Sequence, residues 1–156
     1  MAIHPDDPAQ NIFGLPRICK SEADLERIIE MVDSPMNSLT ICTGSLASGP
    51  DNDVPKILER FVKMNRVAFV HARNIKYTGQ YDFHETSHLS CDGKLDMYAL
   101  MKILVDNEFK GYVRPDHGRN IWNEVSMPGY GLYDRALAEE YLYGLIEAIT
   151  RHKKEA

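Results

Sequence analysis

Apolar and polar positions along the chain follow two alternating patterns, one typical of β-strands and one typical of amphipathic helices. Short runs rich in apolar and β-branched residues predict four strands, at Met1–Ile3, Ser38–Cys42, Arg66–Val70 and Gly111–Val113. Longer runs with apolar residues three and four positions apart predict four helices, at Ser21–Val32, Val54–Met64, Leu95–Phe109 and Tyr133–His152. Strand and helix therefore alternate four times along the chain.

Repeated strand–helix units are typical of an α/β fold with parallel strands and right-handed crossovers, either a doubly wound sheet or a barrel. The loops that follow the later strands are long and polar, at Thr43–Asp53, Asn74–Lys94 and Arg114–Gly131. Because the ends of parallel strands share one edge of the sheet, we expect this edge to carry the functional site. The pattern predicts one domain over residues 1–152 and a solvated tail at 153–156.

Composition and charge narrow the classes of protein. The chain of 156 residues is 44% apolar, which is typical of a folded domain, and its net charge of −5 offers no basic surface for nucleic acid. No apolar run reaches the roughly 20 residues that span a bilayer, so we expect a soluble, cytoplasmic protein. The three cysteines, Cys19, Cys42 and Cys91, form no CxxC pair and do not predict a disulfide framework.

Potential metal ligands stand at the C-terminal ends of the four predicted strands. They are His4, Cys42, His71 and Asp116, one from each strand. Imidazole, thiolate and carboxylate groups are the usual ligands of divalent transition metals, and four neighbouring strand ends would bring these side chains to one point. Each of these residues could instead have a purely structural role. This alternative is strongest for Cys42, because cysteine is often a small buried apolar residue. A thiolate with two imidazoles would by itself favour zinc.

Motifs spread from end to end resemble those of the mannonate dehydratase family. They are HPDDP at His4–Pro8, IFGLPRI at Ile12–Ile18, CTGS at Cys42–Ser45, DND at Asp51–Asp53, HARNIK at His71–Lys76, RPDHGR at Arg114–Arg119 and PGYGLYDRA at Pro128–Ala136. The resemblance implies a (β/α)8 TIM barrel that converts D-mannonate to 2-dehydro-3-deoxy-D-gluconate in hexuronate (glucuronate) degradation. It also implies Mn2+ or Fe2+ as the metal, with His4, Cys42, His71 and Asp116 as its ligands.

Members of that family are about twice as long as this chain, so its four units correspond to the C-terminal half of an eight-unit barrel. The predicted partners are the sugar acid D-mannonate and either a second copy of the chain or the missing N-terminal half-barrel. We favour the interpretation that the sequence is part of a longer protein. Neither nucleic acid nor a membrane is an expected partner.

Dehydration also needs groups that transfer protons and bind the substrate. We expect Tyr130, in the PGYG turn, and His117, beside Asp116, to act as acid and base, although Tyr130 could be a packing aromatic and His117 could instead orient Asp116. Candidate substrate-binding residues are Arg73, Asn74, His84, Arg114 and Arg119. His84 and Glu85, on the long third loop, could assist this chemistry or bind hydroxyls. Arg73 or Arg114 could pair with neighbouring acids instead of a substrate carboxylate.

Two other functions fit parts of the pattern. A metal-dependent sugar isomerase or epimerase on a similar barrel would also use strand-end histidine and aspartate ligands, but such enzymes favour carboxylate-rich sites, and Cys42 argues against that class. An inactive fragment that only binds metal or another subunit is the second alternative, favoured by the length of the chain.

Overall fold

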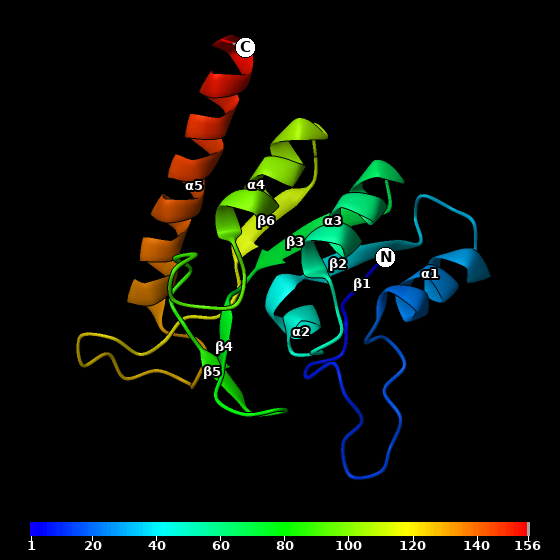
Figure 1. Cartoon of the computed structure of the whole chain (residues 1–156), viewed down its shortest axis with the longest axis horizontal. Helices are drawn as coiled ribbons and strands as arrows, with labels where there is room; N and C mark the ends of the chain where they lie inside the picture. Colours follow the sequence, from blue (N-terminus) through cyan, green and yellow to red (C-terminus); the bar gives the residue numbers. More distant parts are fainter. Residues whose placement is uncertain (156) are drawn as a thin grey trace.

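The computed structural model, which describes residues 1–155, shows a parallel sheet with helices packed on one face (Figure 1). The elements in chain order are β1 (Ala2–Ile3), α1 (Glu22–Met31), β2 (Ser38–Cys42), α2 (Thr43–Ala47), α3 (Val54–Lys63), β3 (Val67–Ala72), β4 (Ile75–Tyr77), β5 (Phe83–Glu85), α4 (Met97–Asp106), β6 (Tyr112–Pro115) and α5 (Leu132–Glu155). The predicted α/β class, the four strands and the four long helices are confirmed.

The main sheet has the strand order β1-β2-β3-β6, and every neighbouring pair is parallel. Chain order is therefore also spatial order, as in successive units of a barrel. Within residues 1–155 no strand lies beyond β1 or β6, so the sheet keeps two free edges and does not close. Four parallel units are consistent with half of a barrel, and a closed barrel is not seen in this part of the chain.

The core lies between the sheet and the helices. Leu39 and Ile41 of β2 and Val70 of β3 have no exposed surface, and they belong to one cluster with apolar residues of α3 and α4 such as Phe61 and Leu100. On the other face of the sheet the residues of β2 are also buried, but toward β6 the face becomes exposed: the aromatic ring of Phe69 contacts those of His71 and Tyr112, and Tyr112 is 79% exposed. The sheet thus presents one face to a packed core and the other to the side that a closed barrel would enclose.

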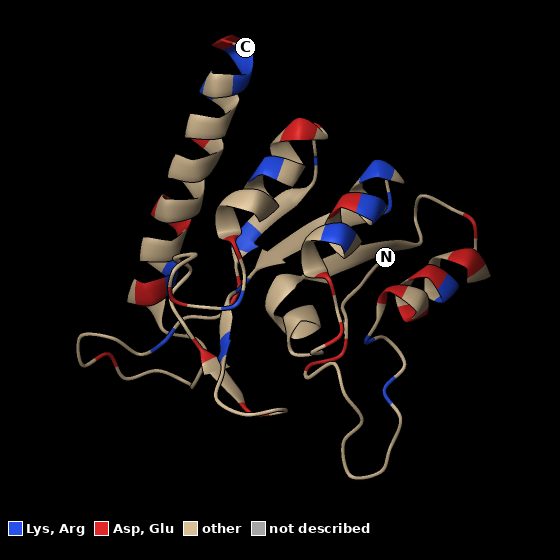
Figure 2. Cartoon of the chain, viewed as in Figure 1, with Lys and Arg blue, Asp and Glu red and all other residues tan. Residues whose placement is uncertain are grey.

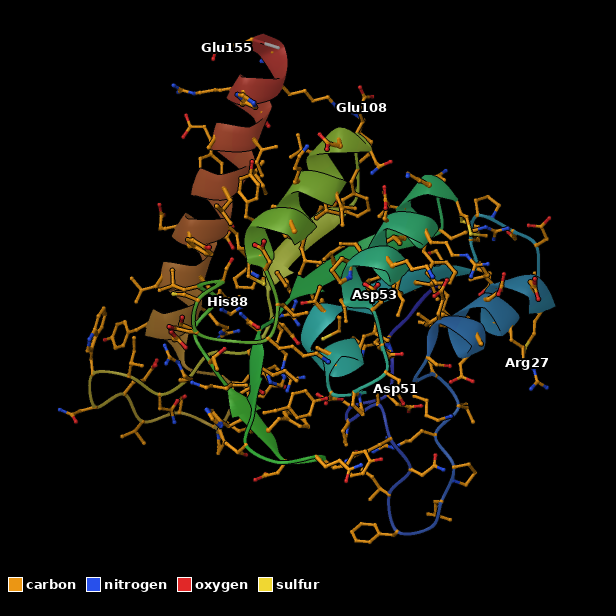
Figure 3. The ribbon with its side chains drawn as sticks, viewed as in Figure 1. Arg27, Asp51, Asp53, His88, Glu108 and Glu155 are labelled. Carbon is orange, nitrogen blue, oxygen red and sulfur yellow. The ribbon has the colours of Figure 1, made fainter. Side chains whose placement is uncertain are left out.

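Polar side chains cap the starts of the helices. Ser21 accepts a hydrogen bond from the backbone N–H of Asp24 at the start of α1. Asp53, labelled in Figure 3 at the start of α3, accepts one from the backbone N–H of Lys56. Gly111, just before β6, is required by close packing, since a Cβ atom there would lie 2.4 Å from the carbonyl oxygen of Ala68. These contacts fix the ends of the elements that lead into the site.

The structure corrects several predicted boundaries. The loop expected at Thr43–Asp53 begins with the short helix α2, and the loop expected at Asn74–Lys94 contains the antiparallel hairpin of β4 and β5. The third strand runs on to Ala72, and α5 continues through Glu155, beyond its expected end at His152, with residues 153–155 exposed.

The fourth strand also runs further than expected, through Pro115. Proline lacks the N–H that a strand ladder uses, but the next residue supplies it: the backbone N–H of Asp116 donates to the carbonyl of Ala72 at 2.9 Å. The strand therefore keeps its pairing up to the residue that carries the candidate ligand.

Charged side chains are mixed over the surface. Figure 2 shows Lys and Arg interspersed with Asp and Glu on the helices, with no broad basic face among the residues drawn in colour. None of the helices described for residues 1–155 is long and apolar enough to cross a membrane.

Candidate metal centre

The C-terminal ends of the four parallel strands bring the four predicted ligands together. His4 follows β1, Cys42 ends β2, His71 lies near the end of β3 and Asp116 follows β6. Cys42 is the register partner of His71, and His71 is that of Arg114, two residues before Asp116. One ligand atom from each of the four side chains lies within 4.8 Å of all the others. The predicted convergence is confirmed.

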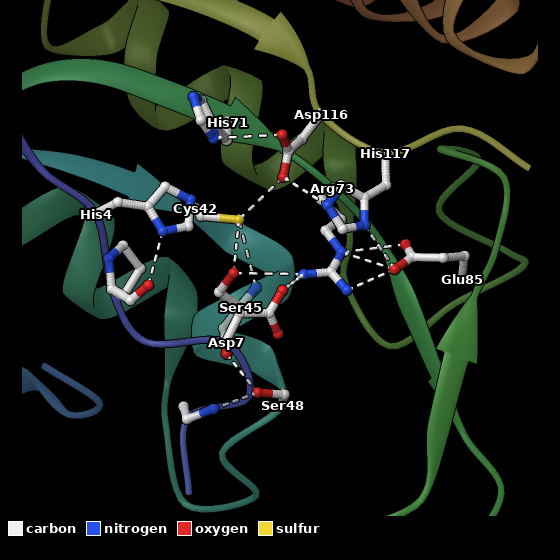
Figure 4. Close-up of polar contacts among 12 residues, drawn as sticks. His4, Asp7, Cys42, Ser45, Ser48, His71, Arg73, Glu85, Asp116 and His117 are labelled. Atoms are coloured by element: carbon white, nitrogen blue, oxygen red, sulfur yellow. Dashed lines mark hydrogen bonds and ion pairs between the residues drawn. The ribbon is translucent and has the colours of Figure 1, made fainter. Parts of the chain in front are cut away.

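The contacts within this quartet leave metal-binding atoms free (Figure 4). Cys42 Sγ lies 3.4 Å from Asp116 Oδ2, and His71 Nδ1 lies 3.4 Å from Asp116 Oδ1. His4 Nδ1 is 2.7 Å from the carbonyl oxygen of Pro5. A carbonyl only accepts, so His4 Nδ1 carries the proton and its Nε2 keeps a lone pair. His71 Nδ1 is buried and makes no hydrogen bond.

The electrostatics of the quartet suit a divalent cation. Burial lowers the pKa of His71 to about 4, against the opposing effect of Asp116, so the imidazole is neutral and able to coordinate. Burial and the Asp116 carboxylate raise the pKa of the Cys42 thiol to about 12. A bound cation reverses that effect, because a coordinating thiol loses its proton. An unpartnered buried imidazole nitrogen beside a carboxylate and a thiol is therefore a fitting donor set for a transition metal.

The helix α2 supports the sulfur atom of this site. Cys42 is the residue before the helix, and its Sγ receives the Ser45 hydroxyl at 3.0 Å and the Ser45 backbone N–H at 3.5 Å. Both groups donate toward sulfur and stabilise negative charge there. The sequence does not predict this helix, because Thr-Gly-Ser after a strand is more typical of a loop.

A second polar cluster lies beside the quartet and contains His117. His117 Nδ1 is 2.8 Å from Glu85 Oε1, and its Nε2 is 3.7 Å from Asp116 Oδ2. Glu85 in turn receives hydrogen bonds from Arg73. Burial acts to raise the pKa of Glu85, but the hydrogen bonds from His117 and Arg73 outweigh it and lower that pKa to about 2. Glu85 is therefore an ionised carboxylate at neutral pH.

Tyr130 lies close to His117, as the predicted pairing of these residues requires. The centroids of the two rings are 6.1 Å apart. The backbone N–H of Gly118 donates a hydrogen bond to the carbonyl of Gly129 at 3.0 Å, which holds the turn that contains Tyr130 close to His117. Tyr130 is 51% exposed, so its hydroxyl is accessible. The acid and base roles of Tyr130 and His117 stay predictions.

The three arginines predicted to bind substrate are all paired with carboxylates. Arg73 is 3% exposed and bonds Asp7 and Glu85, the internal pairing that the sequence left open. Arg119 donates through Nε and Nη2 to Asp134, at 2.9 and 3.0 Å. Arg114 Nη2 is 2.7 Å from Asp116 Oδ1, yet its side chain stays 42% exposed beside the quartet. Only Arg114 combines exposure with a position at the site.

Two other predicted substrate contacts have different positions. The Asn74 side chain is buried and bonds only backbone groups, donating to the carbonyls of Leu89 and Leu95 and accepting from the N–H groups of Ile75 and Leu95. Its amide is fully used in these contacts, and the expected contact with a substrate hydroxyl stays a prediction. His84 is exposed on β5, opposite Lys76, and is not part of either cluster.

Sequence reasoning missed two members of the second cluster. The sequence predicts no role for Asp7 in the HPDDP motif, whereas Asp7 bonds Arg73. For Glu85 it predicts assistance in the chemistry or hydroxyl binding, whereas Glu85 bonds Arg73 and His117. A pattern of charges alone does not reveal these pairs, since Asp7 and Arg73 are 66 positions apart. The signal in the sequence is that both acids lie in the polar stretches that follow the first and third predicted strands, at the edge of the sheet where the candidate ligands meet.

Comparison with known proteins gives consistent results. The family model described as D-mannonate dehydratase (UxuA) matches residues 1–156. A mannonate dehydratase from Geobacillus thermodenitrificans is 54% identical over 155 residues, 99% of this chain and 42% of the relative. One from Lactococcus lactis subsp. cremoris is 54% identical over 99% of this chain and 44% of the relative. The chain thus spans less than half the length of these relatives.

Solved structures show the same correspondence. The crystal structure of mannonate dehydratase from Streptococcus suis serotype 2 superposes with a TM-score of 0.95 at 50% identity, over 99% of this chain and 44% of that one. A D-tagatose 3-epimerase-like protein matches with a TM-score of 0.63 at 18% identity, over 99% of this chain and 49% of that one. At that identity the second likeness concerns the fold alone.

Proposed function

The chain belongs to the D-mannonate dehydratase family, and we propose that it supplies the metal site of an enzyme that converts D-mannonate to 2-dehydro-3-deoxy-D-gluconate and water. The observation that carries this proposal is the convergence of His4, Cys42, His71 and Asp116 from four strand ends, in a chain matched by the family model along its whole length. The predicted setting is glucuronate degradation in the cytoplasm.

We propose Mn2+ or Fe2+ as the metal held by these four residues. The donors are two imidazole nitrogens, a thiol sulfur and a carboxylate. When bound, such a cation acts as a Lewis acid that stabilises negative charge on substrate oxygens. Four protein ligands would fill a tetrahedral zinc site, whereas metals that accept a higher coordination number keep positions open for substrate.

The reaction removes a proton from C2 of the sugar acid and the hydroxyl from C3, and the resulting enol becomes the 2-keto product. Two groups must transfer protons, one from C2 and one to the departing hydroxyl. His117 and Tyr130 lie together beside the quartet, and we assign the two transfers to this pair. Their closeness to each other and to the quartet supports this assignment.

We propose that Arg114 binds the carboxylate of the substrate. Its guanidinium group is partly exposed and already lies 2.7 Å from Asp116. Guanidinium matches a carboxylate in a bidentate geometry, so the group could turn from Asp116 to the substrate. Arg73 and Arg119 are held by their own acidic partners and serve the structure.

We further propose that the active unit is an eight-stranded barrel, completed by four more strand–helix units. Grooves with a largely apolar lining lie beside both edge strands. The groove beside β1 is lined by Met1, Ile3, Ile28, Met31, Val32 and Met36, with Ser34 and Asn37. The groove beside β6 is lined by Leu104, Val105, Phe109, Val113 and Ile146, together with Glu108, Lys110, Gly111, Thr150, Lys153 and Lys154. Further units packed on these edges would cover this surface and pair the edge strands.

The test is formation of the 2-keto product from D-mannonate, with Mn2+ under reducing conditions. The chain is assayed alone and together with the N-terminal part of the Geobacillus thermodenitrificans relative that precedes the matched region. We expect turnover in the combined sample and its loss in the Cys42→Ala variant. Absence of product in the combined sample, with the full-length relative active, would refute the proposal. Interconversion of sugars without dehydration would favour the isomerase alternative.

A further inference from the structure

Glu85 contacts His117 in a way that selects one form of the imidazole ring. Its Oε1 atom lies 2.8 Å from His117 Nδ1. An ionised carboxylate can only accept hydrogen bonds, so the nitrogen that faces it must carry a proton. The opposite nitrogen, Nε2, is then free of a proton in the neutral ring, and it lies on the side of Asp116, 3.7 Å from Oδ2. Figure 4 shows the His117 ring between Glu85 and Asp116, with one ring nitrogen toward each carboxylate.

Glu85 is itself held rigidly. Arg73 Nε is 3.1 Å from both carboxylate oxygens of Glu85, and Arg73 Nη2 is 2.5 Å from Oε1. The remaining arm, Nη1, is 2.6 Å from Asp7 Oδ2, so the guanidinium group joins the hairpin to the loop after β1. Arg73 is 3% exposed, and Gly44 makes room for its stem, since a Cβ atom at Gly44 would lie 2.4 Å from Arg73 Cγ and Cδ.

We propose that Glu85 is a positioning residue that keeps the proton of His117 on Nδ1, and that Arg73 and Asp7 hold Glu85 in place for this task. The inference rests on the proton-transfer role proposed above for His117. It makes His117 the base of the pair and Tyr130 the acid, because Nε2 without a proton can accept the proton from C2, and Glu85 keeps Nε2 in that form. Because the buried Arg73 donates through Nη1 to Asp7 and through Nε and Nη2 to Glu85, it also keeps the Glu85 carboxylate from rotating away from His117.

The alternative is that the cluster only stabilises the fold. In that case His117 would be either an imidazolium ion paired with Glu85, with protons on both nitrogens, or a neutral ring that exchanges between its two tautomers. The two views differ in the protonation state of Nε2, which nitrogen NMR reports directly. Because no substrate is needed, this measurement is independent of whether the chain dehydrates mannonate.

The experiment records long-range ¹H–¹⁵N spectra of the ¹⁵N-histidine-labelled, metal-free chain, well above the ordinary imidazole pKa of about 6.5. The chain has six histidines, and the His117→Asn spectrum identifies the signals that belong to position 117. We expect Nδ1 to be of the protonated type and Nε2 of the unprotonated type. A protonated Nε2, or exchange-averaged signals, in the unmodified chain would overturn the proposal without any further variant.

The matched variants are Glu85→Ala and, as control, Glu59→Ala, which removes an exposed carboxylate paired with Lys63 on α3. We expect Glu85→Ala to move His117 toward the Nε2-protonated or averaged form and Glu59→Ala to leave it unchanged. In the combined sample that turns over mannonate, Glu85→Ala should lower kcat about 10–100-fold with little change in KM, as for other residues that orient a catalytic group. An unchanged tautomer in Glu85→Ala would refute the positioning role.

Discussion

The substitution Glu85→Gln should cost stability in a way that depends on pH. The pKa of Glu85 falls from an ordinary value of 4.5 to about 2 in the folded chain. Because the folded pKa is the lower one, the ionised carboxylate stabilises the fold above about pH 4.5, and this contribution is lost as the pH falls toward 2. Glutamine has nearly the same shape but no charge, so it mimics the protonated form at every pH.

The magnitude follows from the size of the shift. At about 1.36 kcal/mol for each pH unit, a fall from 4.5 to about 2 corresponds to about 3 kcal/mol. The side chain is 24% exposed, so screening by solvent reduces this to about 2 kcal/mol. Such a loss would be a large part of the stability of a domain of this size.

The assay is urea unfolding followed by far-UV circular dichroism at pH 7, 5 and 3 for the unmodified chain, Glu85→Gln and the control Glu59→Gln. The gap between the unmodified chain and Glu85→Gln should be about 2 kcal/mol at pH 7 and should shrink at pH 3. The control, an exposed helix pair, should stay within about 0.5 kcal/mol throughout. A gap of the same size at all three pH values would mean that shape and not charge is responsible, and the reasoning would fail.

Other predictions concern the metal, the reaction and the backbone. Cys42→Ala should weaken metal binding roughly 100-fold, because it removes one of four ligands from a site whose total binding free energy is typically ~10–16 kcal/mol. Unchanged affinity in a chelator competition would exclude Cys42 as a ligand. Apparent metal affinity should rise about tenfold per pH unit around neutrality, because the Cys42 thiol, with its pKa near 12, releases a proton on binding, whereas His71 is already neutral; a flat profile would contradict this. Tyr130→Phe should abolish mannonate dehydration in the combined sample while leaving metal uptake intact, and normal turnover would remove Tyr130 from the reaction. Gly111→Ala should destabilise the chain by about 1–3 kcal/mol because its Cβ would meet a backbone carbonyl, whereas Gly144→Ala, where a Cβ meets nothing within 4 Å, should be neutral or slightly stabilising; equal thermal midpoints would refute the difference.

The convergence of the four candidate ligands could be predicted from sequence because it depends only on where each residue stands relative to the end of its strand. Each ligand stands where an apolar run gives way to a polar loop, and parallel strands bring such points together whatever the details of the loops. His71 illustrates the tolerance of this argument: the third strand ran further than expected and took in His71, yet its side chain still reached the quartet.

The second cluster could not be predicted in the same way, because its members are chosen by three-dimensional contacts. From the sequence Arg73 is a candidate for binding the substrate carboxylate, but in the structure its N–H groups donate to Glu85 and Asp7. Asn74 resembled a hydroxyl contact, but its amide completes the backbone of a loop some 20 residues away, a demand that composition does not reveal. The short helix α2 was not predicted because its first three residues, Thr43, Gly44 and Ser45, are poor helix formers, and tertiary burial overrides their propensity.

The identity of chain order and sheet order, β1-β2-β3-β6, has a consequence for synthesis. During translation each new strand emerges next to the one it will pair with, so the sheet can grow by addition at one edge without rearrangement of earlier strands. The ligands emerge in the sequence His4, Cys42, His71 and Asp116, and the carboxylate that contacts both the thiol and the second imidazole comes last. A nascent chain lacking Asp116 would hold only three of the four candidate ligands, so metal binding at the proposed site would have to wait until the residue after the fourth strand has been synthesised.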